Sequence, residues 1–129
     1  GLAIEDPRSR GGVFNSMGWA TLHLARPEEA VSWFEKALES GVEPEDPIVG
    51  LIEASYARGV PADAVKHAQR LVELHGAMAW SRSKLIEAHL RAGDEAEVAK
   101  LTDEALTSVL TAHLLPRFRA ILTGVEQQG

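Results

Sequence analysis

The chain has 129 residues, the length of one domain, and no cysteine, which excludes disulfides and thiolate metal sites. Its net charge of −6, from 19 acidic against 13 basic residues without a basic run, argues against nucleic acid as a ligand. No stretch approaches the roughly 18 consecutive apolar residues that a membrane helix needs, so we expect a soluble protein that does not bind membranes. We expect it in the cytoplasm, although the absence of cysteine does not by itself distinguish the cytoplasm from the periplasm.

The first residues carry no sustained helical pattern. They include Pro7 and the Gly11-Gly12 pair among mixed charges, so residues 1–12 are predicted to form a leader or linker. Because the chain starts with Gly1 instead of Met, we also expect it to be a piece of a longer protein.

The first predicted helix starts near Val13 and ends before Pro27, because proline disfavours the helical conformation in the residue that precedes it. Pro27 then opens a second helix, since a proline in the first turn lacks only an N–H that would have had no partner. The apolar stripe of the first helix is Val13, Met17, Ala20 and Leu24. The expected buried face of the second is Ala30, Val31, Phe34, Ala37 and Leu38.

Prolines at the starts and glycines at the ends also mark the next pair of helices. Asp46-Pro47 opens a third helix that Gly59 closes, and Pro61 opens a fourth helix that ends at Gly76. Their apolar residues also fall at helical spacing, namely Ile48, Leu51, Ile52 and Tyr56, then Ala64, Val65, Ala68, Leu71 and Val72.

A third pair follows, and it ends differently. The fifth predicted helix closes at Gly93, after which Asp94 caps a sixth. No glycine interrupts this sixth helix before Pro116, so it is predicted to be longer than its counterparts. A seventh helix, with one apolar and one polar face, is predicted to cap the domain at about residues 115–126.

Small and apolar residues recur at intervals of 34 residues. A fixed period of this length, with apolar residues at helical spacing inside each copy, predicts a helical solenoid in place of a single closed core. The recurring sets are Ala25, Gly59 and Gly93; Leu22, Tyr56 and Leu90; Ala30, Ala64 and Val98; and Leu38, Val72 and Leu106. Three copies are predicted, at about 13–44, 45–78 and 79–112, within a single domain of residues 13–129.

The first copy follows a pattern of small, small, aromatic and small residues at Gly18, Ala30, Phe34 and Ala37. With this pattern it strongly resembles the tetratricopeptide repeat. The second copy departs from the motif, with Ile52 at the small position and Ala68 in place of the aromatic residue. The resemblance implies an all-α fold, a right-handed α-α superhelix of about seven helices, in which the first helix of each pair lines a concave groove.

The resemblance also implies which residues face that groove. They are Asn15, Trp19, Leu22 and His23 in the first copy; Val49, Glu53 and Tyr56 in the second; and Ser83, Glu87, Leu90 and Arg91 in the third. Such a surface fits an extended or helical peptide of partly apolar and partly basic character. Trp19 and Tyr56 are candidate anchors, and packing between neighbouring helices is the alternative role for both. Packing is the expected role of Trp33 and Trp80.

The sequence shows no nucleophile elbow, phosphate loop, dinucleotide fingerprint or metal-ligand spacing. Its histidines are expected on the surface or in the groove: His23, His67, His75, His89 and His113. We therefore expect a non-enzymatic module that needs no cofactor or metal and binds a protein or peptide. One alternative is self-assembly, either as a homodimer or against another domain of the same chain. A second is a structural spacer in a larger protein. A third is RNA recognition by a related helical repeat, but the net negative charge argues against it.

Overall fold

The computed structural model describes residues 7–76 and 78–113, which form six α-helices and no strand. The helices are α1 (Pro7–His23), α2 (Pro27–Glu39), α3 (Glu45–Ala57), α4 (Pro61–His75), α5 (Ala79–Ala92) and α6 (Glu95–His113). The all-α prediction is confirmed for this part of the chain. The seventh helix, predicted for about 115–126, lies outside the described residues.

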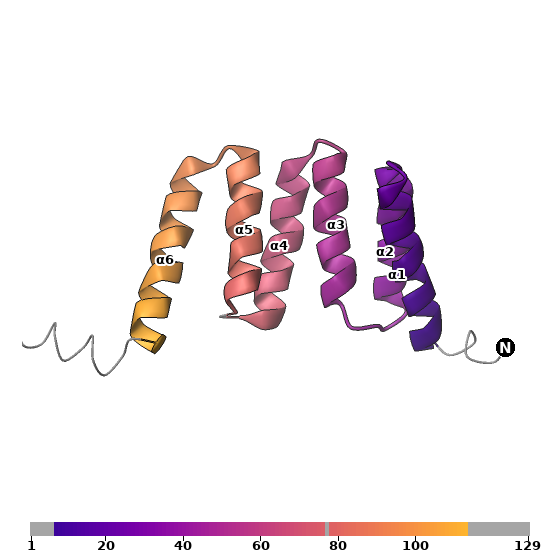
Figure 1. Ribbon diagram of the computed structural model, residues 1–129, viewed down its shortest axis with the longest axis horizontal. Helices are drawn as coiled ribbons and strands as arrows, with labels where there is room; N and C mark the ends of the chain where they lie inside the picture. The colour runs from indigo at the N-terminus through magenta and orange to yellow at the C-terminus, as the bar shows by residue number, and fades with distance from the viewer. Residues whose placement is uncertain (1–6, 77, 114–129) are drawn as a thin grey trace, which may run out of the picture.

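The helices stand in a row in chain order, with α1 at one end and α6 at the other (Figure 1). Each helix packs on the next one, and α1 also contacts α3. Among the described helices, none combines the length and the apolar character of a membrane span.

The turns that close α1, α3 and α5 share one geometry. Each contains a residue with positive φ, namely Ala25 at 60°, Gly59 at 74° and Gly93 at 81°. The N–H of the following residue donates to a carbonyl five residues back, in the pairs Arg26–Thr21 at 2.9 Å, Val60–Ser55 at 2.9 Å and Asp94–His89 at 3.0 Å. This bond, with a second from the positive-φ residue itself, is the Schellman arrangement that satisfies the last carbonyls of a helix.

The predicted ends of the later helices are largely confirmed. Pro27 and Pro61 are the first residues of α2 and α4. Asp94 caps α6, because the Glu97 N–H donates to Asp94 Oδ1 at 3.2 Å. At 19 residues α6 is longer than α2 and α4, which have 13 and 15 residues. The absence of a glycine before Pro116 predicts this difference.

The predicted leader is too long, because α1 already begins at Pro7. Proline suits a first helical turn. Gly11 is buried, and a Cβ built on it would overlap Ser40 and Val42 at the end of α2. The glycine at this position therefore allows α1 to approach closely the segment that follows α2, and it does not mark a flexible linker.

The apolar stripe predicted for α1 does not face the core. Val13 is 49% exposed, Met17 39% and Leu24 64%. The side of α1 that contains Gly18 and Thr21 is buried instead, and the rings of Phe14 and Trp19 pack on Trp33 and Phe34 of α2.

Two clusters form the core. One joins α2 to α3 through Ala30, Phe34 and Leu51. The other joins α3, α4 and α5 through Ile48, Ile52, Ala64, Ala68, Leu71, Leu85 and Ala88. Phe34 is fully buried, and its ring lies against the backbone of two helices, because a Cβ on Gly18 would come within 2.5 Å of the ring and one on Gly50 would overlap it. The apolar faces predicted for α2, α3 and α4 therefore form the core.

Candidate functional site

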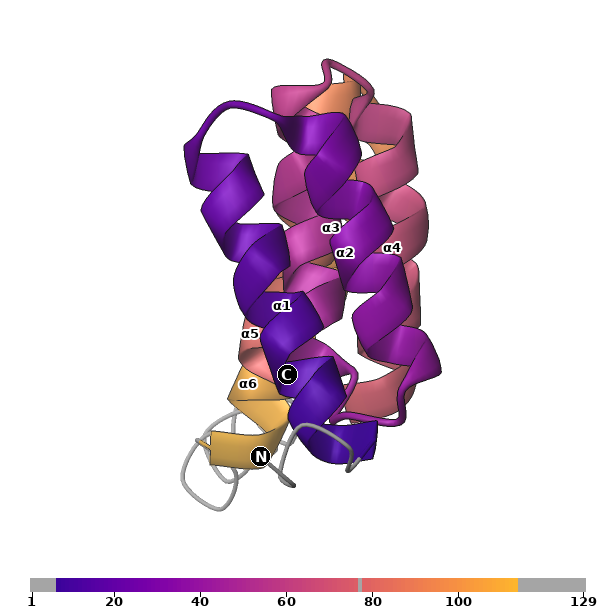
Figure 2. The same ribbon diagram turned by 90° about the vertical axis from the view of Figure 1, so that its right-hand side faces the viewer.

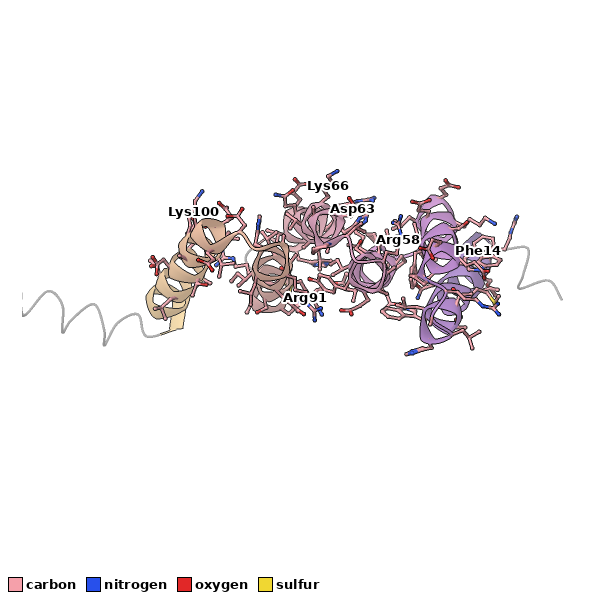
Figure 3. The ribbon with its side chains drawn as sticks, turned by 90° about the horizontal axis from the view of Figure 1, so that it is seen from above. Phe14, Arg58, Asp63, Lys66, Arg91 and Lys100 are labelled. Atoms are coloured by element: carbon pink, nitrogen blue, oxygen red, sulfur yellow. The ribbon has the colours of Figure 1, made fainter. Side chains whose placement is uncertain are left out.

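An open groove of about 690 Å³ lies along α1 and α3 and is bounded by α5. The three helices run in the same direction, because a returning helix separates each from the next (Figure 1). Eight residues line the groove: Trp19, Leu22, His23, Val49, Glu53, Tyr56, Ala57 and Arg91. All of them except Ala57 are among the residues predicted from the sequence. Arg91 points to one side of the row, and Lys66 of α4 points to the opposite side (Figure 3).

Asp46 holds Trp19 at the wall of the groove. The Trp19 Nε1–H donates to Asp46 Oδ2 at 2.8 Å, and the Asn15 amide donates to the same oxygen. Because Asp46 lies in the first turn of α3, these bonds tie α1 to α3. The Trp19 ring also packs edge-on against Phe34, with centroids 5.3 Å apart. Trp19 thus packs between neighbouring helices, the alternative to its predicted role as an anchor, and its remaining surface lines the groove.

Tyr56 contributes a buried hydroxyl to the groove. This oxygen has no hydrogen-bond partner among the described residues, and the Arg91 guanidinium carbon lies 4.1 Å from the centre of the ring. Burial, with a further contribution from the negative charge of Glu87, raises the pKa of Tyr56 to about 12. Arg91 lowers the pKa, and Glu53 raises it slightly. A buried hydroxyl without a partner costs about 1–3 kcal/mol. The oxygen is closed to solvent, so a polar group of a ligand recovers this cost only if a neighbouring side chain moves aside.

The charged residues of the groove are paired across and along the helices. Glu53 Oε1 lies 3.9 Å from Lys84 Nζ, and Glu87 Oε1 lies 3.3 Å from an Arg91 Nη. All four side chains keep at least 30% of their surface exposed. Ion pairs of this kind contribute little to stability, about 0–1 kcal/mol, so a charged ligand can displace one partner at low cost.

Four predicted groove residues do not line the cavity. Asn15 and Glu87 act through neighbours, as partners of Asp46 and Arg91. Ser83 and Leu90 lie on the exposed surface of α5, and Leu90 is 61% exposed. Arg91 is the residue by which α5 reaches the groove, because its long side chain extends over the Tyr56 ring.

Tyr56 provides a direct test of this geometry, because it is the only tyrosine in the chain. Titration of the phenolate absorbance should give a midpoint near 12 in the folded protein, and near 10 in concentrated urea. Since folding strengthens proton binding, this group stabilises the fold below pH 10, and the contribution is lost as the pH rises through 12. A folded midpoint near 10 would mean that the ring is open to water.

Two of the described histidines, His75 and His89, have structural contacts. His75 Nε2 lies 2.6 Å from Glu45 Oε1, and the His75 ring lies 5.3 Å from that of Trp80, which is 37% exposed. His89 is 9% exposed, which corrects its expected place on the surface or in the groove, and its Nδ1 lies 3.6 Å from Asp94. Within residues 7–76 and 78–113, no group of three His, Asp or Glu side chains could hold a metal ion.

A second cavity, of about 410 Å³, lies between α4, α5 and α6 and was not predicted. Its lining is Val72, Gly76, Arg82, Leu85, Leu101 and Glu104.

Comparisons with known protein families, curated proteins and solved structures find no match to this chain.

Proposed function

We propose that this chain is a non-enzymatic protein-interaction module of the tetratricopeptide-repeat type, a right-handed stack of helix pairs whose groove binds a peptide or a partner domain. The observation that carries the proposal is the groove itself, where side chains from α1, α3 and α5 line one open cavity that includes the Tyr56 side chain. The shared turn geometry at 34-residue intervals supports the stack of repeats.

The lining of the groove indicates the chemistry of the ligand. Trp19, Leu22 and Val49 offer an apolar wall for an apolar side chain. A polar group beside it could pair with the Tyr56 hydroxyl, and a basic side chain could replace Lys84 as the partner of Glu53. We therefore expect a peptide segment in which an apolar residue is flanked by a basic one.

The test is a selection of binders from a library of random short peptides, followed by affinity measurements by fluorescence anisotropy. Glu53→Ala and Arg91→Ala should each weaken binding about tenfold, the loss of roughly 1.4 kcal/mol expected at an interface centre. Both side chains are well exposed, so neither change empties the core. Lys66→Ala, on the opposite face (Figure 3), should leave affinity unchanged. Binding that depends on Lys66 and not on Glu53 or Arg91 would place the site on the opposite face.

A further inference from the structure

At one end of the row, an apolar face of α1 is not covered by any other described helix. Val13 is 49% exposed and Met17 39%, and beside them the ring of Phe14 stacks on Trp33 with centroids 5.9 Å apart. Figure 2 looks onto this end of the row, with α1 and α2 nearest the viewer, and Figure 3 shows Phe14 there.

The corresponding residues inside the row form a helix interface. Counting 34 residues on from Val13, Phe14 and Met17 leads to Pro47, Ile48 and Leu51 of α3. Pro47 and Ile48 are fully buried, and Leu51 is 2% exposed in a cluster with Ala30 and Phe34 of α2. One period further, Leu85 of α5 is 8% exposed in the core cluster that it shares with α4. The exposed face of α1 is thus the face through which α3 and α5 pack on the helix pair before them.

The other end of the row shows the complementary face. Leu38 of α2 and Val72 of α4 are partly buried, and each packs on the core cluster that contains residues of the next helix. Leu106, which is 34 residues after Val72, lies on α6 and is 56% exposed. The face of α6 therefore corresponds to the one by which α2 and α4 pack on the pair after them.

The two end helices also differ in charge. α1 contains two arginines, Arg8 and Arg10, and no acidic residue. α6 contains four acidic residues and one lysine, namely Glu95, Glu97, Asp103, Glu104 and Lys100. Opposite charges favour contact between α1 and α6, and like charges disfavour contact between two copies of α1 or of α6.

We propose that copies of this chain associate end to end, with α6 of one copy packed on α1 of the next, so that the row of helices continues across the contact. The neighbouring copy then covers the exposed Leu106 face of α6, in place of the capping helix expected at about 115–126. The interface joins two different faces and leaves one of each free, so it does not close at a dimer, and chains of copies form. The groove lies on other faces of the helices, so this proposal and the proposed peptide binding are tested separately.

Sedimentation velocity of the 129-residue chain over a range of concentrations tests the proposal. The average mass should rise past that of a dimer, and the association should weaken at about 1 M salt, where charges are screened within roughly 3 Å. Met17→Glu blocks the α1 face and Leu106→Glu blocks the α6 face, so each variant alone should stay monomeric. Mixed together they should form a one-to-one dimer, because each retains one intact face.

Leu74→Glu is the matched control, because Leu74 is 48% exposed on α4, away from both end helices, and this variant should associate like the wild type. Circular dichroism checks that every variant keeps its helices. Dimers of Leu106→Glu without a partner would show an α1–α1 contact and overturn the proposal. A wild-type chain that remains monomeric up to about 1 mM would also overturn it, because its end faces are then covered by other segments or are too weak to associate.

Discussion

Replacing Phe34 with alanine is expected to lower the free energy of unfolding by about 3–5 kcal/mol, the usual cost of removing a buried aromatic ring. Phe34 is fully buried, lies against the backbone at Gly18 and Gly50, and packs on the Trp19 ring. The backbone of two helices cannot easily collapse into the space that the ring leaves, which favours the upper part of this range. Urea unfolding followed by circular dichroism measures the effect.

The matched control for this prediction is Phe14→Ala. Phe14 is half-buried at the end of the row and stacks only on Trp33 among the described aromatic rings. Its removal should cost much less than that of Phe34, because the area that it buries is smaller and water can fill the space. Equal losses for the two variants would show that Phe34 is not the central contact of the first three helices.

Helix ends were predictable from the sequence where they depend on local chemistry. Pro27 and Pro61 start helices because a first-turn proline loses no hydrogen bond, and Gly59 and Gly93 end them because they adopt positive φ readily. Ala25 occupies the same conformation without that freedom, and the turn is indicated by Pro27 and by the spacing of Ala25 from the two glycines.

The start of α1 was not predictable in this way. A Gly-Gly pair marks either a flexible linker or a close contact between helices, and only the positions of Ser40 and Val42 decide which one. The exposure of Val13 and Met17 has the same origin. Their helical spacing predicts a face but does not show whether another element covers it.

The second copy's departure from the motif has a packing explanation. In the first copy a large ring, Phe34, lies on Gly18, while in the second Ala68 and Ile52 are both fully buried in one cluster. Gly18 and Phe34 correspond to Ile52 and Ala68, so the large residue lies on the second helix of the first pair and on the first helix of the second pair. Cores tolerate such exchanges when the total volume is kept, so the departure does not weaken the case for equivalent helix pairs.

Most of the groove residues were predicted through the resemblance to the tetratricopeptide repeat, which assigns the groove to the first helix of each pair. The role of Asp46 was not predicted, since its sequence context shows only an acid at a helix start, and its partners Asn15 and Trp19 are distant in the chain. Leu90 and Ser83 are exposed and fall outside the cavity, whose α5 lining is Arg91.

Gly50→Ala should destabilise the protein by about 1–3 kcal/mol, although alanine is normally the better residue in a helix by about 0.5–1 kcal/mol. Gly50 is buried within α3, and the added Cβ would overlap the Phe34 ring, which is held from the other side by Gly18. Because the ring is fully buried between two helices, it can move only if the helices separate. Urea unfolding should therefore show a lower midpoint.

Gly12→Ala provides the control with the opposite sign. Gly12 also lies inside a helix, but it is exposed and a Cβ on it would have no neighbour within 4 Å, so this variant should gain about 0.5–1 kcal/mol. Adding Phe34→Leu to Gly50→Ala should recover part of the loss, because a smaller side chain makes room for the new methyl group. A gain in stability from Gly50→Ala equal to that from Gly12→Ala would contradict the close contact between Phe34 and α3. The relative positions of α1 and α3, which line the groove, depend on that contact.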